Sequence, residues 1–238
     1  MNVKLVLLSI LAMCIAVPSI SFAAKVLEYR FDDPSATLAV DTSGNNLDGT
    51  FVGSSIHLEL GLPGHGYGVS LNGVDDFINS GDPSLLDISK IYTLMAWINY
   101  SETTERNAEI MEKGGAYWLN IRMDTKLVRA GGFFKDCNIP NQRLKNTDSQ
   151  ISVPTNTWSH IASTYNGTKL NIFVNGQLAR SFSLTGNVCV NNNPLAVGAK
   201  YVPAKGLKQN FVKGMMDDVR IYNNALSVSQ IQNLMVQP

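Results

Sequence analysis

The sequence has few residues of the kinds that build metal centres, and it has no excess of charge of either sign. It contains three cysteines and three histidines in 238 residues, and its 19 basic residues equal its 19 acidic residues. The cysteines and histidines are scattered, without the short spacings of a zinc site. Balanced charge also removes the electrostatic reason to bind nucleic acid or an anionic membrane surface. The composition therefore favours a protein with neither a zinc centre nor a polyanionic partner.

Long hydrophobic runs are absent beyond the N-terminal segment. The one such run, Leu5–Val17, is interrupted at Pro18 and is shorter than the roughly 20 residues that span a membrane. Small residues, Ser21 and Ala23, stand where a secretory signal is cut. A membrane anchor is the alternative, but length and cleavage pattern favour a signal peptide over residues 1–23. We therefore expect a secreted or periplasmic protein without membrane insertion after cleavage.

The expected mature chain, residues 24–238, is long enough for one domain with its own core. Loss of Lys4 leaves 18 basic and 19 acidic residues. Only Cys137 and Cys189 remain, and two cysteines in an exported protein most economically form one disulfide. Two separate buried thiols are the alternative. No repeat or polar linker divides the chain, so we expect a single domain.

Many short segments alternate between apolar and polar residues, and turn clusters separate them. Examples are residues 26–31 (VLEYRF) and 92–100 (YTLMAWINY). Residues 158–184 contain Asn-Gly at positions 166–167 and 175–176, which permits the positive φ of tight hairpins and predicts three consecutive strands. Helix signals are confined to residues 226–235, where Ser227 is a candidate N-cap. The pattern predicts an all-β sandwich with one short C-terminal helix.

Two charged stretches have weaker patterns. Residues 101–113 (SETTERNAEIMEK) contain four dispersed glutamates, and we interpret the stretch as a loop or an edge. Residues 200–210 (KYVPAKGLKQN) are interpreted as a solvated loop. Its side chains Tyr201, Lys200, Lys205 and Lys208 are secondary candidates for ligand contact.

Several motifs in order resemble a known family. They are YRFDD, DTSGNNLDGTFVG, GYGVSLNGVDDFINSGD, YTLMAWINY, WSHIASTYNGTKLNIFVNG, PLAVGAK and FVKGMMDDVRIYNNALSVSQI. Together they resemble a laminin-G-like, concanavalin A-like jelly-roll domain of the kind found in secreted bacterial proteins. The resemblance implies a sandwich of two antiparallel sheets, one concave and one convex. Members of the family mostly bind carbohydrate or protein ligands, or serve as accessory modules beside enzymes.

Catalytic constellations of such sandwiches are not recognisable. The related hydrolases carry E-x-D-x-x-E on one strand, which is missing here, as are G-x-S-x-G and H-E-x-x-H. We therefore expect a non-catalytic module.

The resemblance also implies a structural calcium site. If Val219 and Ile221 face the sandwich interior, alternation places Asp217 inward, where a carboxylate needs a cation or several donors. Calcium takes six to eight oxygen ligands. The candidate ligands are Asp32, Asp41, Asn46 and Asp217. The alternative is that Asp41 caps its own Asx-turn and Asp217 pairs with Arg220 or a backbone amide.

The candidate ligand surface lies between residues 113 and 143, the part of the chain that is least similar to the family. Sugar sites combine aromatic platforms with planar polar groups. Phe133 and Phe134 are adjacent, so one of them must face away from the core if the segment is a strand. The expected disulfide would pin two loops beside this surface. The candidate residues are Tyr117, Trp118, Arg122, Arg129, Phe134, Asn141 and Arg143.

Three functions follow from these observations. The first is a secreted carbohydrate-binding module, for which the aromatic, arginine and asparagine side chains are suited. The second is an adhesion or structural module that binds an extracellular protein through exposed loops. The third is a polysaccharide-active enzyme. A fold does not fix a function, so the ligand itself stays open at this stage.

Overall fold

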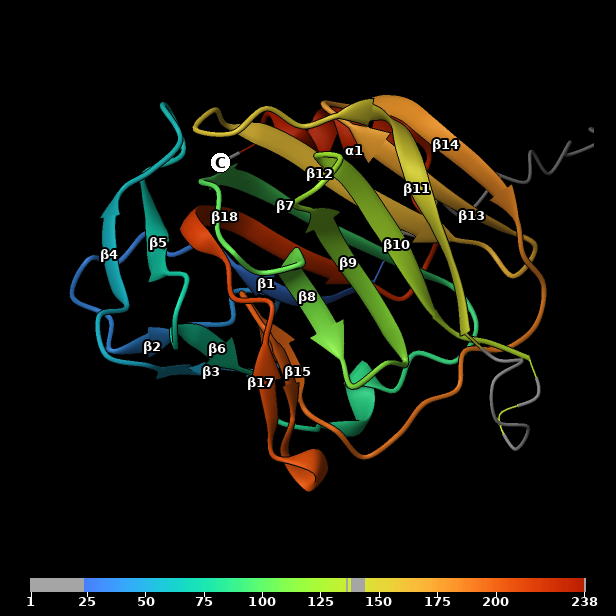
Figure 1. Cartoon of the computed structure of the whole chain (residues 1–238), viewed down its shortest axis with the longest axis horizontal. Helices are drawn as coiled ribbons and strands as arrows, with labels where there is room; N and C mark the ends of the chain where they lie inside the picture. Colours follow the sequence, from blue (N-terminus) through green and yellow to red (C-terminus); the bar gives the residue numbers. More distant parts are fainter. Residues whose placement is uncertain (1–23, 136, 138–143, 238) are drawn as a thin grey trace, which may run out of the picture.

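The chain forms two antiparallel β-sheets that face each other across one core, as the computed structural model shows (Figure 1). The structure describes residues 24–135, 137 and 144–237. The expected signal peptide, residues 1–23, lies outside the described residues. In the described part of the chain, no helix has the length and apolar character needed to span a membrane. The predicted jelly-roll sandwich with a short C-terminal helix is confirmed.

The first sheet runs in the order β14-β13-β12-β7-β18-β5-β4, and β1 pairs with one part of β18. All of its pairings are antiparallel. Its strands are β1 (Lys25–Tyr29), β4 (His57–Leu60), β5 (Tyr67–Asn72), β7 (Tyr92–Tyr100), β12 (Ser159–Tyr165), β13 (Lys169–Val174), β14 (Gln177–Ser183) and β18 (Lys213–Tyr222).

The second sheet runs in the order β11-β10-β9-β8-β15-β6-β3-β2. A separate hairpin of β16 and β17 follows β15. The strands are β2 (Leu38–Ala39), β3 (Gly49–Val52), β6 (Phe77–Asn79), β8 (Asn107–Lys113), β9 (Tyr117–Arg122), β10 (Leu127–Phe133), β11 (Leu144–Ser152), β15 (Leu195–Val197), β16 (Lys200–Val202) and β17 (Leu207–Gln209). Two 3₁₀ turns, η1 (Ser84–Leu86) and η2 (Pro203–Lys205), complete this part.

The Asn-Gly turns produce the predicted meander of β12, β13 and β14. Asn175 has a φ of +48° and Gly176 a φ of +72°, the left-handed pair that a two-residue hairpin needs. At the other turn, the Asn166 side chain accepts hydrogen bonds from the backbone N–H groups of Thr168 and Lys169. The local turn chemistry therefore fixes the register of three neighbouring strands.

Helix α1 (Val228–Met235) covers the outer face of the first sheet. Its predicted N-cap is confirmed, because the Ser227 hydroxyl accepts from the Gln230 backbone and the Gln230 side chain bonds back. Ile231 is fully buried against Met95 and Phe173 of the sheet. Burial of one such side chain stabilises the fold by about 1.5–3 kcal/mol.

Both weakly patterned stretches contain strands, contrary to the sequence interpretation. Residues 107–113 form β8, an interior strand between β9 and β15. Residues 200–209 form the β16–β17 hairpin, in which the Tyr201 ring packs at a tilt against Phe77 with ring centroids 5.1 Å apart. Lys208 lies 5.6 Å from the centre of the Tyr201 ring, so both side chains have partners within the fold.

Candidate functional site

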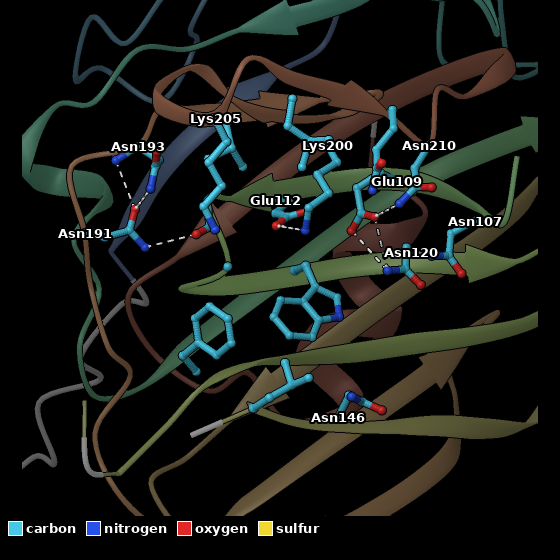
Figure 2. Close-up of a pocket in the computed structure, with 18 of the residues that line it drawn as sticks. Asn107, Glu109, Glu112, Asn120, Asn146, Asn191, Asn193, Lys200, Lys205 and Asn210 are labelled. Carbon is cyan, nitrogen blue, oxygen red and sulfur yellow. Dashed lines mark hydrogen bonds and ion pairs between the residues drawn. The ribbon is translucent and has the colours of Figure 1, made fainter. Parts of the chain in front are cut away.

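A groove of about 920 Å³ lies on the outer face of the second sheet. Its floor comes from β8, β9, β10 and β11, and the β16–β17 hairpin and the loop around Asn191 form its walls (Figure 2). Alternation explains the polar floor. On β9, Leu119 and Ile121 pack into the core, so Trp118 and Asn120 face the groove. The second sheet therefore has an apolar inner face and a polar, open outer face.

Cross-strand pairing arranges residues on the outer face of β8, β9, β10 and β11 in two parallel rows. Each row takes one residue from each of the four strands, and directly paired residues share a face. The first row is Glu109, Asn120, Arg129 and Asp148. The second row is Glu112, Trp118, Gly131 and Asn146.

A β-bulge puts two glutamates of β8 on the same face. The register of β8 against β9 shifts between Glu109 and Met111, and Ile110 and Met111 both pack into the core. The extra residue breaks strict alternation, so that Glu109 and Glu112, three positions apart, both line the groove.

Glu109 is held only by neutral partners. Its side chain is 2% exposed, and the Asn120 amide donates to its two oxygens at 3.0 and 3.3 Å. The Asn210 amide donates to Oε2 at 3.4 Å. Burial, followed by the charge of Glu112, raises the pKa of Glu109 to about 8. At neutral pH this carboxyl is therefore mostly in its acid form.

The charges of the second glutamate and of the arginines are compensated. Lys200 of β16 pairs with Glu112 at 2.8 Å, and burial still raises the pKa of Glu112 above its usual value. Arg129 binds Asp148 through two nitrogens at 2.6 and 3.1 Å. Arg122 reaches the same carboxylate at 3.0 Å.

Two acceptor atoms in the groove lack a partner. The Oδ1 atoms of Asn107 and Asn120 are buried, and none of the described residues donates a hydrogen bond to them. A buried, unpaired polar atom costs about 1–3 kcal/mol. Such atoms beside a cleft indicate that water or a ligand supplies the donor.

The opposite end of the groove is braced by Lys113 and by the disulfide. Lys113 is fully buried, and its Nζ donates to the backbone oxygens of Asn191 and Asn193, both at 2.9 Å. Cys137 and Cys189 both line the groove and form the predicted disulfide, with Cα atoms 5.3 Å apart. These links hold the loop wall against the sheet.

Some of the predicted ligand residues line the groove, whereas others do not. Trp118 and Arg129 line it, and Phe133 packs edge-on against Trp118 with ring centroids 6.2 Å apart. Arg122 lies on the same face but is held by Asp124 and Asp148.

Two other candidates face the core, which corrects the expected surface. Tyr117 is fully buried and donates to the backbone oxygen of Leu86, whereas Phe134 is fully buried against Tyr165. Asn141 and Arg143 lie outside the described residues. The secondary candidates Lys200 and Lys205 line the groove, whereas the sequence interpretation missed the groove residues Glu109, Glu112, Asn120, Asn146 and Asn210.

The candidate calcium ligands do not fit one cation. Asp41 Oδ1 accepts from the backbone of Glu28 and Ser43, and its Oδ2 accepts from Leu47 N and Ser43 Oγ. These four donors give Asp41 the role of a turn cap, and Asn46, with a φ of +57°, belongs to the same turn. Among the described residues, no three His, Cys, Asp or Glu side chains are placed to hold a metal ion together.

Asp217 faces the outside of the first sheet, so the predicted inward orientation is wrong. Met216 packs into the core, and Asp217 pairs with Trp97, a residue of the outer face. A bulge at Asp218, which has a φ of +48°, then returns Val219 to the core. Burial raises the pKa of Asp217 to about 8, and the charge of Asp218 adds to the shift.

The other predicted metal residue, Asp32, pairs with a neighbouring side chain. Arg30 contacts its carboxylate at 3.0 Å on the surface. Asp32 also lies near enough to Asp217 for its charge, in addition to burial, to raise the pKa of that carboxyl, whereas Asp41 and Asn46 belong to a separate turn.

Several domains of larger proteins of known structure have a similar fold. Domain 4 of a GH43 extracellular arabinanase from Geobacillus stearothermophilus, solved with arabinotriose, has a TM-score of 0.65 at 21% identity. The match covers 89% of this chain and 98% of that domain. The binding domain of Paraclostridial Mosquitocidal Protein 1 gives 0.68 at 16% identity, with 89% and 51% covered.

The receptor-binding domain of botulinum neurotoxin C/D mosaic serotype gives a TM-score of 0.63 at 18% identity, with 89% and 50% covered. The chain thus spans about half the length of the toxin binding domains that it matches. No curated protein sequence is significantly similar to this chain. These likenesses establish the fold.

A family model matches residues 72–232, which is more than half of the chain. The matched region contains all six strands of the groove floor and walls, β8, β9, β10, β11, β16 and β17, and also β7 and β18 of the first sheet. The chain therefore belongs to the Laminin_G_3 family of the concanavalin A-like lectin/glucanases superfamily.

Proposed function

We propose that the chain is a carbohydrate-binding module that holds a glycan in the groove of the second sheet. The observation that carries this proposal is the pair of polar rows around Trp118, with buried acceptors that lack a partner among the described residues. An indole gives an apolar platform for a sugar ring, and amides give paired donors and acceptors for hydroxyl groups. The arabinanase domain, solved with arabinotriose, supports this choice by analogy of fold.

A secreted location is part of the proposal. The sequence of residues 1–23 has the features of a signal peptide, and the disulfide is of the kind that persists in oxidising compartments. An extracellular glycan or glycoprotein would be the accessible ligand.

Hydrolysis is the second candidate function, because Glu109 and Glu112 are two buried carboxyls in one groove. Glycosidases use such pairs as acid and base. However, Glu112 is ion-paired with Lys200, so the groove does not offer the pair of unpartnered carboxyls that acid–base catalysis uses. We therefore assign the groove to binding.

The test is a glycan and polysaccharide array with the purified mature protein and two matched variants. Trp118→Ala removes the platform, and Trp158→Ala removes a tryptophan outside the groove. We expect Trp118→Ala to weaken binding about tenfold or more, equivalent to about 1.4 kcal/mol, and Trp158→Ala to retain it.

Equal losses in both variants, or no glycan bound by the wild type, would overturn the proposal. The same samples are assayed for new reducing ends. Their release from a bound polysaccharide, lost in Glu109→Gln, would favour hydrolysis instead.

A further inference from the structure

One end of the groove gathers buried hydrogen-bond acceptors. We call Asn107, Glu109 and Asn120 the acceptor cluster, and Figure 2 shows them together, apart from Asn191 and Asn193 at the opposite end. The Oδ1 atoms of both asparagines have no donor among the described residues. When Glu109 is ionised, these two atoms therefore lack a donor among the described residues.

The orientation of the Asn120 amide determines which kind of group can pair with its Oδ1 atom. Its Nδ2 donates to both oxygens of Glu109, and when Glu109 is ionised a flipped amide would place Oδ1 against a carboxylate oxygen. In the ionised state Oδ1 therefore points away from Glu109. A ligand that satisfies this atom has to bring a hydrogen.

The charges of the groove residues indicate which kind of ligand donor suits the acceptor cluster. Two charged pairs of the groove are compensated, Lys200–Glu112 and Arg129–Asp148, whereas Glu109 contacts amides only. Burial raises the pKa of Glu109 to about 8, so the Glu109 carboxyl is mostly protonated at neutral pH when no ligand is bound. The titratable groups around it are Glu112 of β8, Arg122 of β9, Arg129 of β10, Lys200 of β16, and Glu105 and Arg106 of the preceding loop.

Access limits the size of the donor. Glu109 is 2% exposed and Asn120 is 4% exposed, so a whole sugar ring cannot reach them. Any group that contacts them is therefore smaller than a sugar ring. Trp118 pairs with Glu112 one row further along the sheet, so a ring placed on the indole would direct a substituent toward the cluster.

We propose that the acceptor cluster is a subsite for the protonated amine of an amino sugar, and that the groove takes a glycan with free, unacetylated amino groups. This inference rests on the proposed carbohydrate-binding function. An ammonium group has three donors and a positive charge, so it pairs with the Glu109 carboxylate and can also donate to an amide oxygen of the cluster. A hydroxyl satisfies one acceptor and leaves the carboxylate unpaired.

Binding of an ammonium group is coupled to proton release. At pH 6.0 the free Glu109 carboxyl holds its proton, and it must lose that proton to form the ion pair. Calorimetry in two buffers of different ionisation enthalpy measures this released proton directly.

The experiment compares the unacetylated glucosamine tetramer with its fully N-acetylated counterpart at pH 6.0 and 0.15 M salt. We expect the unacetylated tetramer to bind at least about tenfold more tightly, with release of up to one proton. Glu109→Gln removes both the preference and the proton release while it retains weak binding of the acetylated tetramer. Glu59→Gln, at an exposed position on β4, is the matched control and changes nothing.

A second variant keeps the test decisive if Glu109→Gln does not fold. Asn107→Asp adds a carboxylate to the same cluster, and we expect it to strengthen the preference for the unacetylated tetramer. A preference that neither variant changes would overturn the assignment of the cluster.

The remaining outcomes separate this inference from the proposed function. Equal affinity for the two tetramers without proton release, or array binding of other glycans only, would overturn the amino-sugar subsite and leave the glycan groove standing. Absence of any glycan binding would overturn both.

Discussion

The buried charged side chains on the outer faces of the two sheets have different kinds of partner. On the first sheet, Arg220 binds Glu28 and Asp218 at 2.8 and 2.7 Å and also donates to the backbone oxygens of Leu234 and Gln237. The chain's own C-terminal segment thus closes that face. On the second sheet, Glu109 and the neighbouring amides lie in a groove that no helix of the described chain covers. The same architecture therefore uses one face for stability and offers the other to a ligand.

The largest effect is expected from Arg220→Met on the closed face. Loss of one partner from a buried ion pair costs about 3–5 kcal/mol, because Glu28 and Asp218 stay buried without their counter-ion. Urea unfolding measures the change. Arg180→Met, which removes one hydrogen bond to Thr147 on β11, should cost only about 1 kcal/mol. Similar losses in the two variants would contradict the assigned role of Arg220.

Removal of the disulfide affects the wall of the open face. Cys137→Ser with Cys189→Ser should lower the free energy of unfolding by about 2–4 kcal/mol, since the bond closes a long loop with a sequence separation of 52. Glycan affinity should fall as well, because both residues line the groove. Urea unfolding and the glycan array check the two effects, with reduced wild-type protein as the comparison. Unchanged glycan affinity would show that the disulfide does not contribute to binding in the groove.

A smaller, pH-dependent effect is expected at Asp217. Its pKa is raised in the fold to about 8, so the folded state binds its proton more tightly than the unfolded chain. This group therefore favours the fold at low pH, and its contribution is lost as pH rises from about 4 to about 8. Asp217→Asn should raise the Tm at pH 8.5 and flatten its pH dependence.

The matched control for Asp217 is Asp124→Asn, at an exposed carboxylate paired with Arg122. Its side chain contributes to a surface ion pair, so the Tm should change little. A lower Tm at pH 8.5 in Asp217→Asn would show that the ionised carboxylate stabilises the fold, contrary to the raised pKa.

The smallest effect is expected from chelation. Asp41 already accepts four hydrogen bonds from protein donors, so a chelator such as EDTA should leave the Tm unchanged. The measurement is thermal unfolding with calcium and with chelator. A rise of several degrees with calcium, lost in Asp41→Asn, would restore the calcium site implied by the resemblance.

The fold could be predicted from local signals, whereas much of the site could not. Alternation and Asn-Gly turns are written in contiguous residues, and β12, β13 and β14 follow from them directly. The glutamates of β8 are three positions apart and share a face only because of a bulge. A second bulge, at Asp218, reversed the predicted face of Asp217. A bulge depends on the partner strand, which the sequence around it does not specify.

The ligand surface could also be predicted only in part from the sequence, as two neighbouring residues of β9 show. Trp118 was recognisable as an aromatic candidate, but its neighbour Tyr117 is just as aromatic and lies in the core. Which of the two faces outward depends on the register of β9 against β8 and β10. The partners on the opposite wall, such as Lys200, come from a hairpin distant in sequence.

The most direct test of the account is an NMR titration that follows the three tryptophan indole N–H signals. The array's strongest glycan serves as the titrant. Trp97 donates its indole N–H to the Met235 backbone oxygen on the closed face, whereas Trp118 lines the groove of the open face. We predict that the Trp118 signal shifts to saturation while the signals of Trp97 and Trp158 stay in place. A shift of the Trp97 signal with an unchanged Trp118 signal would contradict the assignment of binding to the second sheet.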